Sequence, residues 1–157
     1  PHAKADTTIG VIDLAKIVET SVAGKDLQSK FKAKKEAVQK EADAFETELK
    51  TKEQSLIKDS KTLDQKAFNE KRTTVGKDLQ KKKEAIITKN VALEKSKNEA
   101  LKTLQAKVAQ ICADIAQEKK IQVILDRSAV VIAQQALDIT GDVITKLDAT
   151  LKTVELK

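Results

Sequence analysis

Aromatic side chains are scarce in this chain. Among its 157 residues there are three Phe and no Trp, Tyr or Met. A compact globule of this length usually buries several aromatics, because each supplies a large apolar area. Here Ala, Leu, Ile and Val supply the apolar content, dispersed among charged residues that make up 34% of the chain. This composition is typical of long helices and coiled coils rather than of one globular core.

Residues that interrupt helices are also rare. The chain has one Pro, Pro1, and four Gly, so long uninterrupted helices are permitted. Over residues 27–119, apolar residues recur mostly at steps of three, four or seven, as in a coiled-coil seam. The seam comprises Val38, Ala42, Phe45, Leu49 and Leu56, and then Val75, Leu79, Ile86, Leu93, Leu101, Leu104, Val108, Ile111 and Ile115.

The two halves of this seam need one turn between them. Asp64 can cap a returning helix, because its carboxylate accepts hydrogen bonds from backbone N–H groups at a helix start. We therefore predict an antiparallel helical hairpin over residues 27–119 with its tip near 62–66. Residues 73–76 combine three β-branched side chains with Gly76 and have low helix propensity, which predicts a bend or a mobile segment there.

The N-terminal end has a strand-like pattern. Residues 8–12 are rich in β-branched side chains and predict a short strand. Asp13 can cap the helix that follows it, and Ser21 can cap a second helix start.

The C-terminal end predicts two further strands. Residues 121–125 and 129–133 flank a turn at 126–128 and together predict a β-hairpin. A last helix follows Leu137-Asp138-Ile139-Thr140, with Asp138 or Thr140 as its cap. The predicted fold class is thus α+β, mainly helical, with the element order β-α-α-α-β-β-α and a long antiparallel coiled-coil hairpin.

Residues 1–26 and 120–157 would then form a discontinuous α/β body, small and rich in β-structure. A small sheet has open edges that invite pairing with another chain, so we expect the body to oligomerise. The candidates for this interface are the apolar residues of the predicted strands and last helix: Ile9, Val11, Val123, Leu125, Val131, Ile144 and Leu147.

The residues needed for common catalytic chemistry are missing. His2 is the only His, and Cys112 is the only Cys. The four Gly are far apart and form no phosphate-binding loop, and a Cys/His metal site cannot be assembled. We expect no enzyme activity, no metal and no cofactor. Cys112 lies among apolar helix residues, which favours a small buried hydrophobe over a reactive thiol.

The net charge of +6 is concentrated in the middle of the chain. Residues 58–83 hold nine Lys or Arg and four acids. One interpretation is a solvated coiled-coil surface; the other is attraction to an anionic partner such as phospholipid, lipopolysaccharide or an acidic polypeptide. The candidate contacts for such a partner, or for an unfolded polypeptide, are Lys71, Arg72, Lys77, Lys81, Lys82 and Lys83.

Localisation depends on the first residues. No apolar run approaches the ~20 residues that span a bilayer. Ala3-Lys4-Ala5 before Asp6 has the small-residue pattern of a secretory cleavage site, while Pro1-His2 is equally typical of an engineered end.

The two ends of the chain contain four recognisable segments: residues 9–17 (IGVIDLAKI), 23–25 (AGK), 123–130 (VILDRSAV) and 137–140 (LDIT), with Val143-Ile144 and Leu147 in the last helix. These segments resemble the Skp/OmpH family of periplasmic chaperones. The charged hairpin between them also fits. Members of that family are homotrimers in which a β-rich body carries three hairpin tentacles around a cavity.

The resemblance implies a holdase that works without ATP. It would keep unfolded outer-membrane β-barrel proteins from aggregating in the periplasm, with anionic lipid or lipopolysaccharide as a further partner. Two other interpretations stay open. A structural coiled-coil spacer would keep a tight seam throughout. A basic nucleic-acid-binding protein would bind with a steep salt dependence, although the hairpin lacks Tyr and Trp for base stacking.

Overall fold

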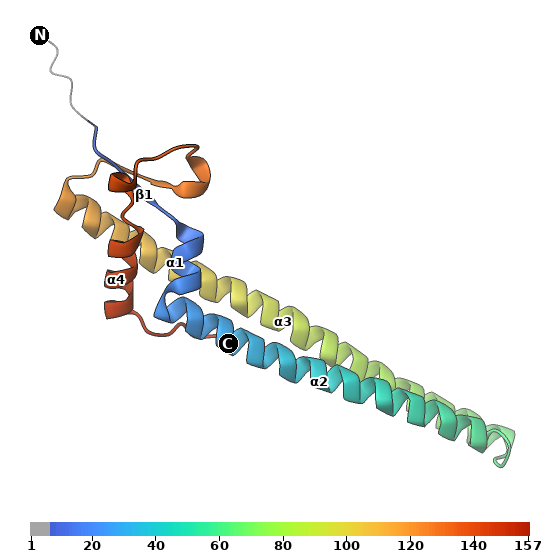
Figure 1. Ribbon diagram of the computed structural model, residues 1–157. Helices are drawn as coiled ribbons and strands as arrows, with labels where there is room; N and C mark the ends of the chain where they lie inside the picture. The colour runs from blue at the N-terminus through green and yellow to red at the C-terminus, as the bar shows by residue number, and fades with distance from the viewer. Residues whose placement is uncertain (1–6) are drawn as a thin grey trace, which may run out of the picture. The chain divides into compact units, whose positions relative to one another are not determined.

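A computed structural model describes residues 7–157 of the chain, which form two compact units (Figure 1). We call the unit of residues 1–30 and 96–157 the base unit, and residues 31–95 the arm. His2 and Ala3-Lys4-Ala5 lie outside the described residues. The elements are β1 (Ile9–Ile12), α1 (Leu14–Thr20), α2 (Val22–Asp59), α3 (Gln65–Lys119), β2 (Val123–Asp126), the short 3-10 helices η1 (Arg127–Ala129) and η2 (Gln135–Leu137), and α4 (Thr140–Thr150). The mainly helical fold with a long hairpin is confirmed.

Polar caps set the helix starts as the sequence predicts. Asp13 accepts a hydrogen bond from Lys16 N–H at 2.8 Å and caps α1. The hydroxyl of Ser21 accepts from Gly24 N–H at 3.2 Å at the start of α2. Asp64 accepts from Ala67 N–H at 2.9 Å and caps α3. These three caps satisfy N–H groups that have no partner within their own helix.

β1 and β2 form a two-stranded parallel sheet in the base unit, with Ile9 opposite Val123. On the other side of β1, the chain returns so that Ile139 N–H donates to the Val11 carbonyl at 2.9 Å. A single bridge joins Val11 to Asp138 there. β1 is therefore flanked on both sides, whereas no described strand pairs with the outer edge of β2.

The predicted β-hairpin of 121–125 and 129–133 is wrong. The first strand forms at Val123–Asp126, but it pairs with β1, and η1 follows it directly. Asp126 accepts from Ser128 N–H at 2.9 Å, and Val130 N–H donates to Arg127 at 3.1 Å, so the chain turns away from β2. Residues 130–133 consequently have no strand partner within the described chain.

The core of the base unit is aliphatic. Ile17, Leu104, Ile115 and Leu147 have no exposed area, and they come from α1, α3 and α4. Cys112 is buried beside them, as predicted, and burial raises the pKa of its thiol. The chain after α4 also contributes, since Val154 and Leu156 are buried.

The arm consists of the outer parts of α2 and α3, which run antiparallel. Lys89 pairs with Glu41 and Lys82 with Glu48, each at 2.6 Å. The residue numbers on α3 therefore decrease as those on α2 increase, as in an antiparallel pair. Lys71 pairs with Asp59 at 2.6 Å near the tip in the same register. α3 continues unbroken through residues 73–76, so no interruption accompanies the low helix propensity there. Helix-forming neighbours and the partner helix outweigh that local preference.

Candidate functional site

The sequence segments that resemble a known family meet in one hydrogen-bonded junction in the base unit. The carboxylate of Asp126 accepts from Leu14 N–H at 3.1 Å and from Ser128 N–H at 2.9 Å. It also accepts from the Ser128 hydroxyl. These hydrogen bonds, the Ser128 hydroxyl first, stabilise the ionised form and lower the pKa of Asp126.

The start of α4 completes this junction. The hydroxyl of Thr140 accepts from Asp13 N–H at 2.9 Å, while Asp138 accepts from Thr140 N–H at 2.9 Å. Hydrogen bonds from Thr140 lower the pKa of Asp138, and Arg127, 3.6 Å away, adds to the effect. Asp138 thus accepts from the first N–H of α4, but the N-cap residue is Ile139, so neither Asp138 nor Thr140 occupies the cap position predicted for them. The junction binds the parts of the base unit together, which is a structural role.

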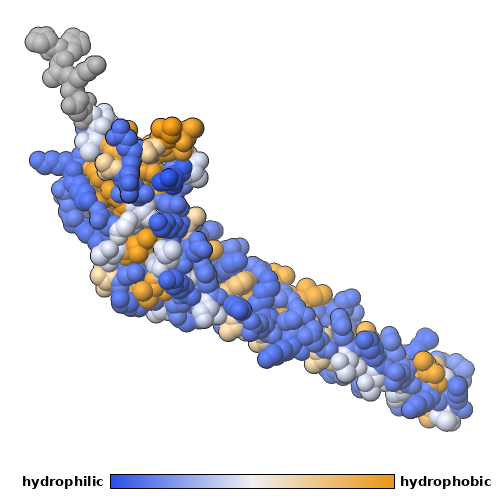
Figure 2. All heavy atoms as spheres, viewed as in Figure 1, coloured by the Kyte–Doolittle hydropathy of each residue, from blue (hydrophilic) through white to orange (hydrophobic). Residues whose placement is uncertain are grey.

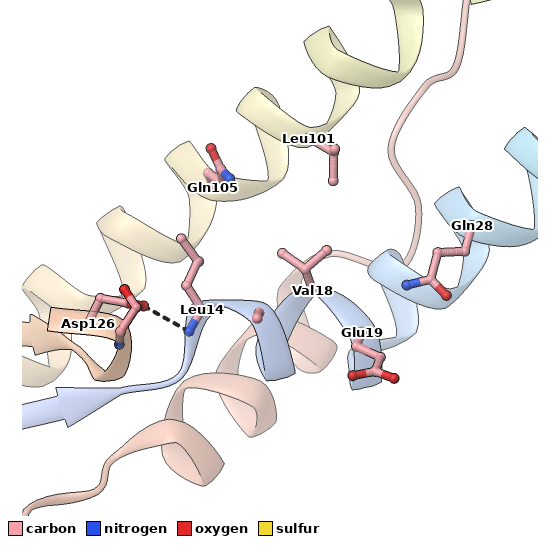
Figure 3. Close-up of a pocket in the computed structure, with 9 residues that line it drawn as sticks. Leu14, Val18, Glu19, Gln28, Leu101, Gln105 and Asp126 are labelled. Atoms are coloured by element: carbon pink, nitrogen blue, oxygen red, sulfur yellow. Dashed lines mark hydrogen bonds between the residues drawn. The ribbon is translucent and has the colours of Figure 1, made fainter. Parts of the chain in front are cut away.

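An apolar pocket of about 640 Å³ lies beside this junction, between α1 and α3 (Figure 3). Leu14 and Val18 point into it from α1, and Leu101 faces them from α3. Its polar lining consists of Glu19, Gln28, Gln105, Asp126 and Ser128. The pocket contains no constellation for acid–base or nucleophilic chemistry, and its lining suits apolar side chains.

Apolar side chains are exposed on the base unit, where orange spheres gather in Figure 2. Val131 is fully exposed at 102%, and Ile132 is 89% exposed. Val123 and Leu125 of β2 are 41% and 39% exposed. Two solvent-facing aliphatic side chains that follow a strand with an unpaired edge favour contact with another chain.

The predicted interface residues therefore fall into three groups. Val11 and Leu147 are 2% and 0% exposed and belong to the core of their own chain. Ile9 and Ile144 are half-buried. Val123, Leu125 and Val131 remain accessible to a partner.

The arm carries a second apolar hollow, a groove of about 590 Å³. Its lining is apolar except for Glu46, Gln80 and Lys83: Ala42, Phe45, Leu49, Gly76, Leu79, Ile86 and Ile87. The sequence predicted five of these residues as seam, but it predicted neither Gly76 nor Ile87 there, and it predicted no groove. The available signal was Gly76, which places no side chain on this stretch of α3.

The predicted basic residues of the arm have different surroundings. Lys82 donates to Glu48 at 2.6 Å, and this hydrogen bond raises the pKa of Lys82. Lys71 pairs with Asp59. For Arg72, Lys77, Lys81 and Lys83 no ion pair is formed with any residue of the described range 7–157. The structure thus brings Lys83 alone of the six to the groove.

Among residues 7–157, no group of three or more His, Cys, Asp and Glu is arranged to hold a metal ion. Within the same range, no helix is sufficiently long and apolar to cross a bilayer.

The fold and its two apolar hollows define a class of protein that combines a long helical hairpin with a small α/β base. Residues 8–147 match the family of outer membrane proteins described as OmpH-like, and the chain belongs to this family. It is 26% identical over 147 residues to the chaperone protein Skp of Yersinia enterocolitica, covering 88% of this chain and 85% of that one. It also superposes with a TM-score of 0.79 on a Caulobacter crescentus protein described as an OmpH-like outer membrane chaperone. That match is 27% identical and covers 99% of this chain and 92% of the other.

Proposed function

We propose that this protein is an ATP-independent holdase of the periplasm that binds unfolded outer-membrane β-barrel proteins and prevents their aggregation. Family membership and the Skp relative support the chaperone class. In this proposal residues 27–119 form a tentacle, and residues 1–26 with 120–157 form the body on which tentacles assemble.

The observation that carries the proposal is the incomplete burial of the seam in the arm. Val38 and Leu93 are 9% and 7% exposed, but the seam residues nearer the tip, among them Phe45 and Leu49, are half-buried. A coiled-coil spacer would bury such positions between its helices. Half-exposed seam residues instead supply many weak apolar contacts for an unfolded chain.

We further propose a homotrimer, as the family resemblance implies. The unpaired edge of β2 and the exposed Val131 and Ile132 support contact between copies in the base unit. The pocket between α1 and α3 could receive such side chains from a neighbouring copy. An interface that joins two different surfaces forms a ring where the rotation between copies closes, and a trimer is such a ring.

An anionic surface is a second proposed partner. Arg72, Lys77, Lys81 and Lys83 are free of ion pairs within residues 7–157, so their charge is available to phospholipid or lipopolysaccharide. Changing Lys81, Lys82 and Lys83 together to Gln should leave the fold intact and weaken binding to anionic vesicles but not to neutral ones.

Light scattering tests the proposed function directly. The purified protein is measured alone and after mixing with an outer-membrane β-barrel protein diluted from urea, without ATP. A trimer that keeps the client in a soluble complex of defined mass is expected. A monomer or dimer that lets the client aggregate would reject the proposal and favour a spacer or a nucleic-acid-binding protein.

A further inference from the structure

The groove of the arm is built around Gly76. This glycine lies within α3, where glycine costs about 1 kcal/mol relative to alanine. A Cβ added at this position would meet no atom within 4 Å, so packing does not require a glycine here. The missing side chain leaves open the groove between Phe45 and Leu49 on α2 and Leu79 on α3.

The length of the groove suits a short extended segment. Its lining on α3 reaches from Gly76 to Ile87, a rise of about 16 Å at 1.5 Å per residue. Side chains on one face of a β-strand are about 7 Å apart, so three of them span about 14 Å. The groove can therefore accept three same-face side chains from an extended chain.

The groove is apolar on its floor and polar at its rim. Lys83 and Glu46 line it beside the apolar residues, and Ile87 is 52% exposed. A transmembrane β-strand alternates apolar and polar side chains. Such a strand can place its apolar face on the floor while its polar face stays in water. A segment that is apolar on both faces would leave one apolar face in water.

The charge around the groove indicates which of these amphipathic strands would bind best. Lys83 has no ion-pair partner in residues 7–157, and the α3 side of the groove, residues 76–87, holds four Lys against two acids. The α2 side, residues 42–49, holds three acids and no Lys or Arg. Acidic residues on the polar face of the bound strand would therefore be attracted to the α3 side, near Lys83.

We infer that the groove around Gly76 is a binding site for one unfolded transmembrane β-strand of the client, with three alternate apolar side chains in the groove and acidic side chains near Lys83. This assignment rests on the proposed holdase function and places one client contact at defined residues. Filling the groove should weaken client binding without affecting the fold.

Because this protein has no Trp or Tyr, client binding can be measured by the Trp fluorescence of the client. All Trp emission in a mixture comes from an unfolded β-barrel client diluted from urea, and its change on titration gives Kd. Gly76→Leu fills the groove, and we expect about tenfold weaker binding, the effect of losing roughly one buried apolar side chain. Thr74→Leu is the matched control, because residue 74 lies about 160° around the helix from residue 76. It should bind as the wild type does.

A second pair of variants controls for any effect of the substitutions on helix stability. Ile87 lines the groove, whereas Val91 lies one turn further along α3, is 64% exposed and does not line it. Ile87→Lys should weaken client binding by about tenfold and Val91→Lys should not. Far-UV circular dichroism should show the same helix content for all four variants.

A dye-labelled peptide identifies the class of ligand. A peptide of about ten residues, the length of a transmembrane β-strand, with alternating apolar and acidic residues should bind the wild type. A peptide with the same residues in two blocks should bind more weakly.

The outcomes separate the two proposals. A wild-type protein that does not retain the client overturns the holdase function. A wild type that retains the client while Gly76→Leu and Ile87→Lys bind it equally well overturns the assignment of the groove alone. A change in oligomeric mass in Gly76→Leu with unchanged client binding also overturns it, since the groove would then be a contact between copies.

Discussion

The carboxylate of Asp126 accepts a hydrogen bond from the backbone N–H of Leu14 at 3.1 Å, although the two residues are 112 positions apart. Leu14 is the first residue of α1, and its N–H has no partner within that helix. Asp126 ends β2 and also holds the turn to Ser128. One side chain therefore fixes the strand, the turn and the helix start together.

Asp126→Ala should destabilise the base unit. The variant removes the hydrogen-bond acceptor for Leu14 and Ser128, and loss of a comparable cap costs about 1–2 kcal/mol. Urea unfolding followed by far-UV circular dichroism measures the change. Asp114→Ala is the control, since Asp114 is exposed on α3 and should tolerate the change within about 0.5 kcal/mol. Equal effects of both variants would contradict a structural role for Asp126.

Folding should also weaken in acid. Hydrogen bonds lower the pKa values of Asp126 and Asp138 below the ordinary aspartate value of 3.8. A lowered pKa in the folded state contributes stability above the unfolded value, and this contribution disappears as pH falls through the folded pKa. The urea midpoint should therefore be nearly constant down to about pH 5 and then decrease. In the double variant Asp126→Asn, Asp138→Asn the urea midpoint should decrease less in acid. An equal decrease in the variant and the wild type would show that these two carboxylates do not cause it.

Gly24 permits the close approach of α1 and α2. A Cβ at this position would lie 1.7 Å from the carbonyl oxygen of Val18, which is backbone and cannot rotate away. Gly24→Ala should lower the free energy of unfolding by about 1–3 kcal/mol, the typical cost of overpacking. Gly76→Ala meets no atom within 4 Å, so it should stabilise the helix by about 0.5–1 kcal/mol. Thermal unfolding of the two variants should shift in opposite directions.

The arm could be predicted from sequence because its pattern is local. The seam spacing predicts the two helices, and the cap at Asp64 predicts the turn between them. Each of these patterns can be recognised from residues that are only a few positions apart. The base unit depends on contacts between distant residues. The parallel pairing of Ile9 with Val123 leaves no local mark on either strand, so the apolar run at 129–133 was assigned the nearest partner in sequence.

The groove and the pocket were not predicted for a related reason. Seam spacing shows which residues face the partner helix, but it does not show how completely that helix covers them. Gly76 was visible in the sequence, and its low propensity predicted a bend. In the structure the same residue is part of a continuous helix and leaves a hollow.

Lys120 ends α3 in a left-handed conformation with φ of 56°. Ile121 N–H donates to the Ala116 carbonyl at 2.9 Å, as expected where a helix closes through a left-handed residue. A side chain with a Cβ is strained in this conformation by roughly 1 kcal/mol, and glycine is not. Lys120→Gly should therefore raise the free energy of unfolding by up to about 1 kcal/mol. The same change at the exposed Lys102, within α3, should lower it by about 1 kcal/mol, because glycine destabilises a helix interior. Urea unfolding measures the change in the free energy of unfolding for both variants. A loss of stability in Lys120→Gly would show that the lysine side chain itself stabilises this helix end.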